Sequence, residues 1–254
     1  MKKITAWQKQ KIRRFVLIVS ALLFPITMIY LSPGMVFRGA RLGILSGSYI
    51  IFMLLFLSAI FVGRLWCAWL CPAGGLCDVM QAVNANGYTT PRLKRVKYVI
   101  WVVWLAAITG VVIFVGKGFS SVDFFLGTYK GISIHSIALM VVCYGVVGFI
   151  LINALFLGKR GFCHTFCWMA PFMVLGRKLG NRLNVKAWRL SVNGDASCSN
   201  CKQCENTCPM SLPIAQMLGE GHTEHMDCIL CGECAATCPN QKLSMRWISL
   251  KKTS

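Results

Sequence analysis

Charged residues are scarce in this sequence, and acidic residues are the scarcest of them. Only 14% of the 254 residues are charged, whereas an average soluble domain has about a quarter. There are 8 Asp and Glu against 27 Lys and Arg, which gives a formal charge of +19. The sequence also has no phosphate-binding glycine loop, no flavin fingerprint and no recognisable catalytic triad. These absences argue against a soluble nucleotide-dependent enzyme. They leave nucleic acid or an anionic membrane face as the partner of the basic residues.

Four long apolar runs explain the low charge. Crossing the hydrocarbon core of a membrane takes a helix of about 20 residues, and each run approaches or exceeds that length. Their approximate limits are Phe15–Leu31, Tyr49–Trp66, Tyr98–Gly116 and Ile134–Leu157. Basic residues flank these runs, so a membrane is the predicted partner and nucleic acid is not. No small-residue cleavage site follows the basic N-terminus, so we interpret the first run as an uncleaved span, kinked at Pro25.

Lys and Arg are concentrated in three of the segments that border these runs. The N-terminal tail, residues 92–97 and residues 159–189 are rich in them, whereas residues 32–48 and 117–133 contain two each. Cytoplasmic segments of membrane proteins carry the excess of basic residues. The sequence therefore predicts a multi-pass protein of a bacterial-type cytoplasmic (inner) membrane, with both termini in the cytoplasm.

The strongest motif lies between about residues 194 and 247, a cysteine-rich segment with little apolar material for a core. It holds two runs of the form C-x-x-C-x-x-C-x-x-x-C-P, starting at Cys198 and at Cys228. In two-cluster ferredoxins the first three cysteines of such a run hold one [4Fe–4S] cluster, and the fourth ligates the other cluster. The predicted ligand sets are Cys198, Cys201, Cys204 and Cys238 for one cluster, and Cys228, Cys231, Cys234 and Cys208 for the second.

Zinc is the main alternative for these cysteines. A structural zinc site usually takes two C-x-x-C pairs separated by a longer loop, rather than three evenly spaced cysteines followed by Cys-Pro twice. A second alternative accepts the clusters but gives them only a structural role. Two adjacent clusters are the usual arrangement for electron transfer, whereas one would be enough to stabilise a small domain, so we favour electron transfer.

A second cysteine pattern is repeated at the cytoplasmic ends of the second and fourth runs. Cys67 and Cys71 form one C-x-x-x-C pair, and Cys163 and Cys167 form the other; each pair follows a basic residue and an aromatic residue. The repeat predicts two tandem two-helix units that bring the four cysteines to one face. They could ligate a further metal centre, form disulfides, accept electrons as thiols or simply pack, and we favour a redox or metal role.

A few other residues are candidates for chemistry. His135 and Asp123 could accept a proton from a quinol, although hydrogen bonding of His135 to lipid headgroups is the favoured interpretation. His164 could be a ligand, a proton relay or a surface residue. Cys77 and Cys143 are interpreted as packing residues. Arg64 and Trp66 lie at the end of the second apolar run, where an arginine can extend its charge to the lipid headgroups and a tryptophan can anchor the helix at the membrane surface.

Nearly the whole chain resembles the NapH/MauN family of membrane-bound ferredoxin-type proteins, which is related to the membrane part of NosR and CcoG proteins. The resemblance rests on the basic N-terminus, the four apolar runs, the two C-x-x-x-C motifs and the two-cluster tail. In that family the second motif usually ends in Cys-Pro, whereas here Trp168 follows Cys167 and the proline is delayed to Pro171. The resemblance implies quinol oxidation with onward transfer to a partner, and its MauN-like members suggest help in maturing a redox enzyme.

The sequence therefore predicts a membrane α-helical bundle in residues 1–190 and a two-cluster ferredoxin-like domain in residues 191–254. The predicted function is electron transfer between quinol and a partner redox protein or enzyme, as in a quinol dehydrogenase subunit. The alternative is an assembly factor that reduces a cysteine, a metal or a cofactor precursor of a partner enzyme.

Overall fold

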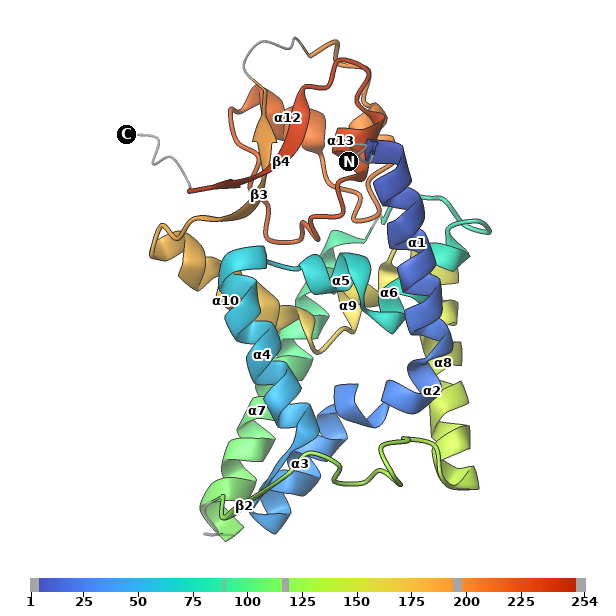
Figure 1. Ribbon diagram of the computed structural model, residues 1–254, viewed down its shortest axis with the longest axis vertical. Coiled ribbons are helices and arrows are strands. Elements are labelled where there is room, and N and C mark those ends of the chain that lie inside the picture. Colours follow the sequence, from blue (N-terminus) through green and yellow to red (C-terminus); the bar gives the residue numbers. More distant parts are fainter. Residues whose placement is uncertain (1–4, 89, 116–118, 194–197, 250–254) are drawn as a thin grey trace.

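The computed structural model describes residues 5–88, 90–115, 119–193 and 198–249. It consists of a helical bundle with a small cysteine-rich domain at one end, here called the tail domain and taken as residues 198–249 (Figure 1). The bundle elements are α1 (Ala6–Leu22), α2 (Phe24–Thr27), η1 (Ile29–Leu31), α3 (Pro33–Leu42), β1 (Ile44–Ser46), α4 (Gly47–Val62), α5 (Leu65–Trp69), α6 (Pro72–Met80), η2 (Pro91–Arg95), α7 (Val96–Val115), β2 (Ser121–Asp123), α8 (Ile137–Leu157), α9 (Gly161–Thr165) and α10 (Ala170–Arg182). They are followed by β3 (Ala187–Val192), α11 (Gln203–Asn206), α12 (Ile214–Gly219), α13 (Glu233–Thr237) and β4 (Leu243–Ile248).

The first predicted span is interrupted. Helix α1 starts at a capping box, in which Thr5 and Gln8 cap each other, and it ends at Leu22. Pro25 then stands in the first turn of α2, where its missing N–H costs nothing. The prediction of a break at Pro25 is confirmed, but the apolar run folds as α1, α2 and η1 rather than as one long helix.

Helices α7 and α8 match the third and fourth predicted spans. Within the described residues, the two helical stretches that are long and apolar enough to cross a membrane are Arg92–Phe114 and Ile137–Leu157. Helix α4 is apolar but has only 16 residues, because Gly63 adopts a left-handed φ of 55° directly after it. Two of the four predicted spans thus meet this length criterion, and the predicted count of four is not confirmed.

Helix α10 packs closely against α4, and this contact needs glycine. A Cβ atom at Gly176 would overlap the carbonyl oxygen of Phe56, and one at Gly180 would overlap that of Ile60. The two small residues lie one turn apart on α10, so they form a flat strip on which the backbone of α4 rests. This packing joins the second apolar run to the segment that follows the fourth.

The structure contains two short two-stranded sheets within the described residues. Strands β1 and β2 pair in parallel, with Ile44 opposite Ser121. Strands β3 and β4 pair antiparallel, from Ala187 opposite Ile248 to Val192 opposite Leu243. Because β3 leaves the bundle and β4 ends the tail domain, this ladder ties the two parts together across the predicted boundary at residue 190.

Ion pairs fix the tail domain on the bundle. Three tail carboxylates each bind two basic side chains from the preceding part of the chain, and Figure 1 shows α1 beginning beside α13 at this junction. The pairs are Glu224 with Arg177 at 2.7 Å and Arg189 at 2.9 Å, Asp227 with Arg64 at 3.2 Å and Lys97 at 2.9 Å, and Glu233 with Arg13 at 2.7 Å and Arg14 at 3.1 Å. The start of α1 and the tail domain therefore lie at the same end of the bundle.

Candidate functional site

The eight tail cysteines gather into two groups of four. One pocket of the tail domain is lined by Cys198, Cys201, Cys204 and Cys238, and a second pocket is lined by Cys208, Cys228, Cys231 and Cys234. These are the two predicted ligand sets, including the exchange of the fourth cysteine between the motifs. The first group is the more accessible, because Cys198 and Cys201 are exposed whereas Cys208 and Cys234 are buried.

The backbone around the two groups follows one pattern twice. Asn200 and Lys202 adopt left-handed φ angles of 52° and 56°, and the equivalent residues of the second motif, Leu230 and Gly232, have φ angles of 57° and 78°. Left-handed backbone is costly for residues with a side chain, and it persists where the surrounding site requires it. Alternation of right- and left-handed residues turns successive N–H groups inward, which forms an anion-binding nest common at iron–sulfur sites.

The amide groups of these nests face the sulfurs. The N–H of Gln203 donates to the sulfur of Cys201, and the N–H groups of Leu230 and Glu233 donate to Cys228 and Cys231. A thiolate gains more from such hydrogen bonds than a neutral thiol does. The four-cysteine sets and their N–H donors therefore suit a group that keeps the thiols deprotonated, and [4Fe–4S] clusters meet that requirement.

No site for a single metal ion is found among the described residues. No group of three or more His, Cys, Asp or Glu side chains in the described ranges is arranged to hold one ion. Zinc binding requires four sulfurs to approach a common centre at about 2.3 Å. The preference for iron–sulfur clusters over zinc rests on the spacing of the tail cysteines in the sequence.

The two C-x-x-x-C motifs are placed at equivalent turns. Cys67 lies on α5 after α4, and Cys163 lies on α9 after α8. Cys71 and Cys167 follow at the ends of those short helices, and the side chains of all four are buried. Burial raises the pKa of Cys71 and raises that of Cys167 to about 12, so neither thiol ionises at neutral pH without a bound partner. The structure places the four cysteines in one region of the core, as the repeat predicts.

Two further sulfur side chains join this region. Cys77, on α6, contacts the thiol of Cys163, and Met173, on α10, lies 3.5 Å from the sulfur of Cys67. The Cys77 contact, despite burial, lowers the pKa of Cys163 to about 7. Cys143 is buried on α8 within a separate apolar cluster, which agrees with its interpretation as a packing residue.

Buried arginines surround the four cysteines of the C-x-x-x-C motifs, and the sequence interpretation of one of these arginines is wrong. Arg64 is 1% exposed and pairs with Asp227, so it does not snorkel to lipid headgroups. Arg160 is fully buried, donates to Asp78 at 2.8 Å and donates to the carbonyl of Cys67 at 2.6 Å. Their burial was missed because a basic residue after an apolar run is normally a surface feature.

His164 is fully buried, which excludes the surface alternative for it. Its ring stacks on that of Tyr88 with centroids 4.4 Å apart. Neither ring nitrogen has a hydrogen-bond partner among the described residues. Burial lowers the pKa of His164 to about 3, so the imidazole is neutral at physiological pH.

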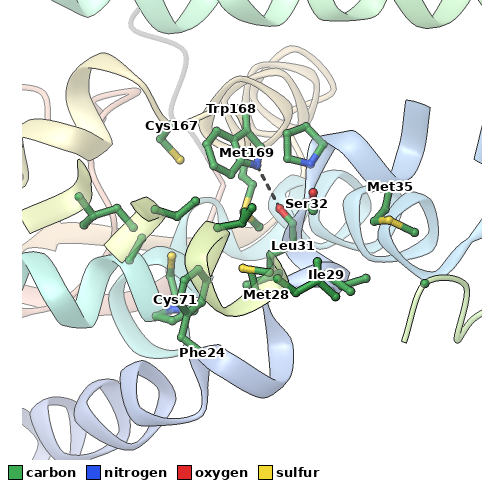
Figure 2. Close-up of a pocket in the computed structure, with 18 of the residues that line it drawn as sticks. Phe24, Met28, Ile29, Leu31, Ser32, Met35, Cys71, Cys167, Trp168 and Met169 are labelled. Carbon is green, nitrogen blue, oxygen red and sulfur yellow. Dashed lines mark hydrogen bonds between the residues drawn. The ribbon is translucent and has the colours of Figure 1, made fainter. Parts of the chain in front are cut away.

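A large apolar cavity is lined in part by Cys71 and Cys167, and we call it the bundle cavity. Its volume is about 660 Å³, and its walls come from the segment that runs from α2 to α3, from the start of α6, from residues 167–169 just before α10, and from α8. Figure 2 shows Cys71 and Cys167 toward one end of the cavity and Met35 toward the other. Trp168, which replaces the usual proline, donates from its indole nitrogen to the carbonyl of Leu31 at 3.1 Å and so holds one wall in place.

Polar groups in the bundle cavity are few. They include Ser32, Arg38, Thr128 and His135. His135 is exposed at the start of α8 and reaches the cavity wall, whereas Asp123, the other predicted proton acceptor, is not among the lining residues. The cavity therefore combines an apolar interior with one imidazole.

Comparison with known proteins agrees with this picture. A family model described as a 4Fe-4S binding domain matches residues 47–86 and 139–186, and a 4Fe-4S dicluster domain model matches residues 197–243. The first model thus matches twice, once over each C-x-x-x-C motif. No solved structure matches.

Three relatives are similar over most of the chain. An uncharacterized protein, MJ0750, of Methanocaldococcus jannaschii is 25% identical over 198 residues, which is 76% of this chain and 76% of its own. A second, MJ0749, is 26% identical over 73% of this chain and 65% of its own. The ferredoxin-type protein NapH of Escherichia coli is 26% identical over 75% of this chain and 65% of its own.

The dicluster match and the two four-cysteine pockets define a ferredoxin-type protein with 4Fe-4S binding domains. More particularly, the similarity over three quarters of its length makes it a NapH-like ferredoxin-type protein.

Proposed function

We propose that this chain is a membrane-anchored electron-transfer protein that passes electrons between quinol and a partner redox protein. The observation that carries the proposal is the bundle cavity, an apolar site of about 660 Å³ that reaches Cys71 and Cys167 in a chain with 4Fe-4S domains. When bound, two [4Fe–4S] clusters would supply one-electron redox chemistry in the tail domain. Their proposed ligands are the two sets of four tail cysteines.

The exposure of α7 and α8 supports a membrane location. The most apolar stretch of Arg92–Phe114 is 6% buried and that of Ile137–Leu157 is 22% buried. The core helix of a soluble protein would be mostly buried, and a signal sequence would lie near the N-terminus, so neither explanation fits. Large exposed apolar surfaces of this kind are expected where lipid replaces water.

We propose that the shorter apolar helices cross the same bilayer, which gives the four-span, N-in and C-in arrangement. Helices α1 and α4 run within the same bundle as α7 and α8 (Figure 1). The start of α1 lies at the tail end of the bundle, where Gln10 donates to the carbonyl of Cys231 at 3.0 Å. The basic residues in the first half of α1, before α7 and after α8 support a cytoplasmic position for that end.

The bundle cavity suits a quinol headgroup. Ligand sites commonly have volumes of roughly 300–1,000 Å³, mostly apolar walls and a few polar groups that orient the ligand. His135 could accept a proton from a quinol hydroxyl, while Arg38 and Ser32 could hold its oxygens. The resemblance to NapH-type proteins implies quinol oxidation, and the position of Cys71 and Cys167 on the wall connects the cavity with the tail side of the bundle.

Photolabelling with a quinone analogue tests this site. The whole chain in lipid nanodiscs should be labelled within residues 24–38 or 135–150, and unlabelled quinone should compete. Val146→Trp, which fills the cavity, should abolish the labelling. Val141→Trp, on the exposed face of the same helix, should not change it. Labelling that is confined to the exposed faces of α7 and α8 would contradict the proposal and would favour a maturation factor that serves a protein partner.

A further inference from the structure

A second large cavity lies where the bundle meets the tail domain, and we call it the junction cavity. Its volume is about 560 Å³, and its walls come from residues 13–18 of α1, from residues 75–85 of α6 and the turn after it, from Lys159, and from residues 206–209 and 233 of the tail domain. Figure 1 shows α1 passing both α13 and α6. The described residues that line this cavity include no cysteine and none of the residues of the bundle cavity.

One part of the junction cavity is apolar and open to the surroundings. Helices α1 and α6 touch along this wall, because a Cβ atom at Gly75 would overlap the carbonyl oxygen of Leu17. Leu17 is buried between them, whereas Ile18 is 46% exposed and Val79 is 52% exposed. Apolar side chains that line a cavity and remain half exposed gain free energy when an apolar ligand covers them. This part of the cavity therefore suits a hydrocarbon chain.

The other part of the junction cavity is charged, and its two carboxylates are already shared. Arg13 is 2% exposed and pairs with Asp78 at 3.1 Å and with Glu233 at 2.7 Å. Asp78 also pairs with Arg160 at 2.8 Å, and Glu233 also pairs with Arg14 at 3.1 Å. Because four cations share two carboxylates, this part of the cavity has an excess of positive charge.

Arg14 and Lys159 carry the charge that a ligand can reach. Arg14 uses Nη2 for Glu233, its side chain is 65% exposed, and its Nε and Nη1 groups make no hydrogen bond to any described residue. Lys159 donates from Nζ to the carbonyl of Asn206 at 2.5 Å, and it pairs with no carboxylate in the part of the chain that the structure describes. Both side chains line the junction cavity. The site therefore offers two cationic donors beside an apolar wall.

We propose that the junction cavity binds one anionic phospholipid, with its phosphate on Arg14 and Lys159 and part of an acyl chain along Ile18 and Val79. Basic pockets beside membrane helices on the cytoplasmic side bind anionic lipid headgroups, and a volume of about 560 Å³ is within the usual range for ligand sites. A free phosphate or an acidic protein segment would match the charge, but neither would cover the apolar wall.

Such a lipid would contact both parts of the chain. Pro209, which directly follows Cys208, and Glu233, which directly precedes Cys234, belong to the wall of the junction cavity. Both cysteines belong to the same group of tail cysteines. The bound lipid would therefore help to hold this group at the membrane surface, beside the ion pairs that already fix the tail domain.

This site rests on the proposed membrane location, and it is tested by native mass spectrometry of the whole chain in detergent. The chain is purified without oxygen and titrated with phosphatidylglycerol and with phosphatidylcholine of the same acyl chains. One phosphatidylglycerol should bind more tightly than phosphatidylcholine. The double variant Arg14→Gln/Lys159→Gln should bind phosphatidylglycerol about twentyfold more weakly, because each basic residue near an anionic lipid contributes about fivefold. The absorbance of the tail clusters is the folding control.

Matched variants separate the site from the overall charge and from the exposed apolar surface. Lys11→Gln/Lys186→Gln removes the same charge from two exposed side chains outside the cavity and should keep the tight binding. Ala82→Trp places a large side chain on the cavity wall and should abolish that binding, whereas Val83→Trp, at a position that is 71% exposed and outside the wall, should keep it.

Several results would overturn the lipid site. Equal affinity of the wild type for the two lipids would do so even if a variant failed to fold, and so would equal losses in the two charge variants. Displacement of the lipid by inorganic phosphate at equal concentration would show a soluble-phosphate site. Tighter binding of a polyglutamate peptide that depends on Arg14 and Lys159 would show a site for an acidic protein segment. A chain that stays monodisperse without detergent would instead refute the proposed membrane location.

Discussion

The ion pairs of Glu224 help to hold the tail domain on the bundle, and removing the charge of this one side chain tests how strongly they do so. Its carboxylate accepts hydrogen bonds from Arg177 at 2.7 and 3.1 Å and from Asn181 at 3.2 Å, and it pairs with Arg189 at 2.9 Å. The two guanidinium side chains are only 5% and 2% exposed. Glu224→Gln keeps the size of the side chain and removes its charge, so two buried cations lose their counter-ion.

The expected loss of stability follows from that burial. Removing one partner of a buried pair typically costs about 3–5 kcal/mol. Arg177 and Arg189 keep hydrogen bonds to the carbonyl of Trp188 and to Asn181, which places the loss near the lower end, about 3 kcal/mol. A free energy of that size corresponds to roughly a hundredfold rise in the opening equilibrium of the docked tail.

Hydrogen exchange of residues 222–227 in the nanodisc-embedded chain measures this change. Glu220→Gln is the matched control, because Glu220 and its partner His222 are 53% and 48% exposed, and exposed pairs contribute about 0–1 kcal/mol. Equal exchange in the two variants would refute the argument that buried pairs hold the tail domain in place.

The same pair predicts a pH dependence. Burial raises the pKa of Glu224, but Arg177 and Arg189 outweigh burial and hold that pKa below its usual range. A lowered folded-state pKa stabilises the protein fully above the unfolded pKa of about 4.3, and this stabilisation is lost as the pH falls below it. The difference between wild type and Glu224→Gln in the free energy of opening of the tail domain should stay constant from about pH 8 to 6. It should narrow only below about pH 4.5.

Two further predictions concern packing and ligation. Gly176→Ala should destabilise the contact between α4 and α10 by about 1–3 kcal/mol in thermal unfolding. Gly148→Ala is the control, because no atom lies within 4 Å of the added Cβ, and it should be neutral or slightly stabilising. Equal effects of the two substitutions would contradict the close packing. Cys204→Ala should lose about four irons and destabilise the tail domain, and retention of both tail clusters with normal folding would show that the ligand assignment is wrong.

The sequence was most informative where spacing encodes local geometry. The cysteine runs predicted two sets of four, and the structure places those same sets around two pockets. The C-x-x-x-C repeat predicted that Cys67, Cys71, Cys163 and Cys167 lie in one region. The break at Pro25 followed from the missing N–H of proline.

Long-range pairing could not be inferred in the same way. Arg64, Lys97 and Arg160 looked like flanking residues of apolar runs, yet each is buried against a carboxylate distant in the sequence. The scarcity of acidic residues was one signal in the sequence that could have indicated this pairing. The chain has only 8 of them, and four form buried ion pairs: Asp78, Glu224, Asp227 and Glu233. The bundle cavity was also hidden, since its walls come from segments that only the fold brings together.

Rapid mixing of the oxidised chain with a quinol analogue, while cluster absorbance is followed, tests the central claim most directly. The experiment uses the whole chain in nanodiscs without oxygen, with His135→Gln and Val141→Trp as the paired variants. We expect fast, saturable bleaching in the wild type and in Val141→Trp, and much slower bleaching in His135→Gln. Slow bleaching that rises linearly with quinol and is the same in all three proteins would contradict electron transfer from a quinol site in the bundle cavity.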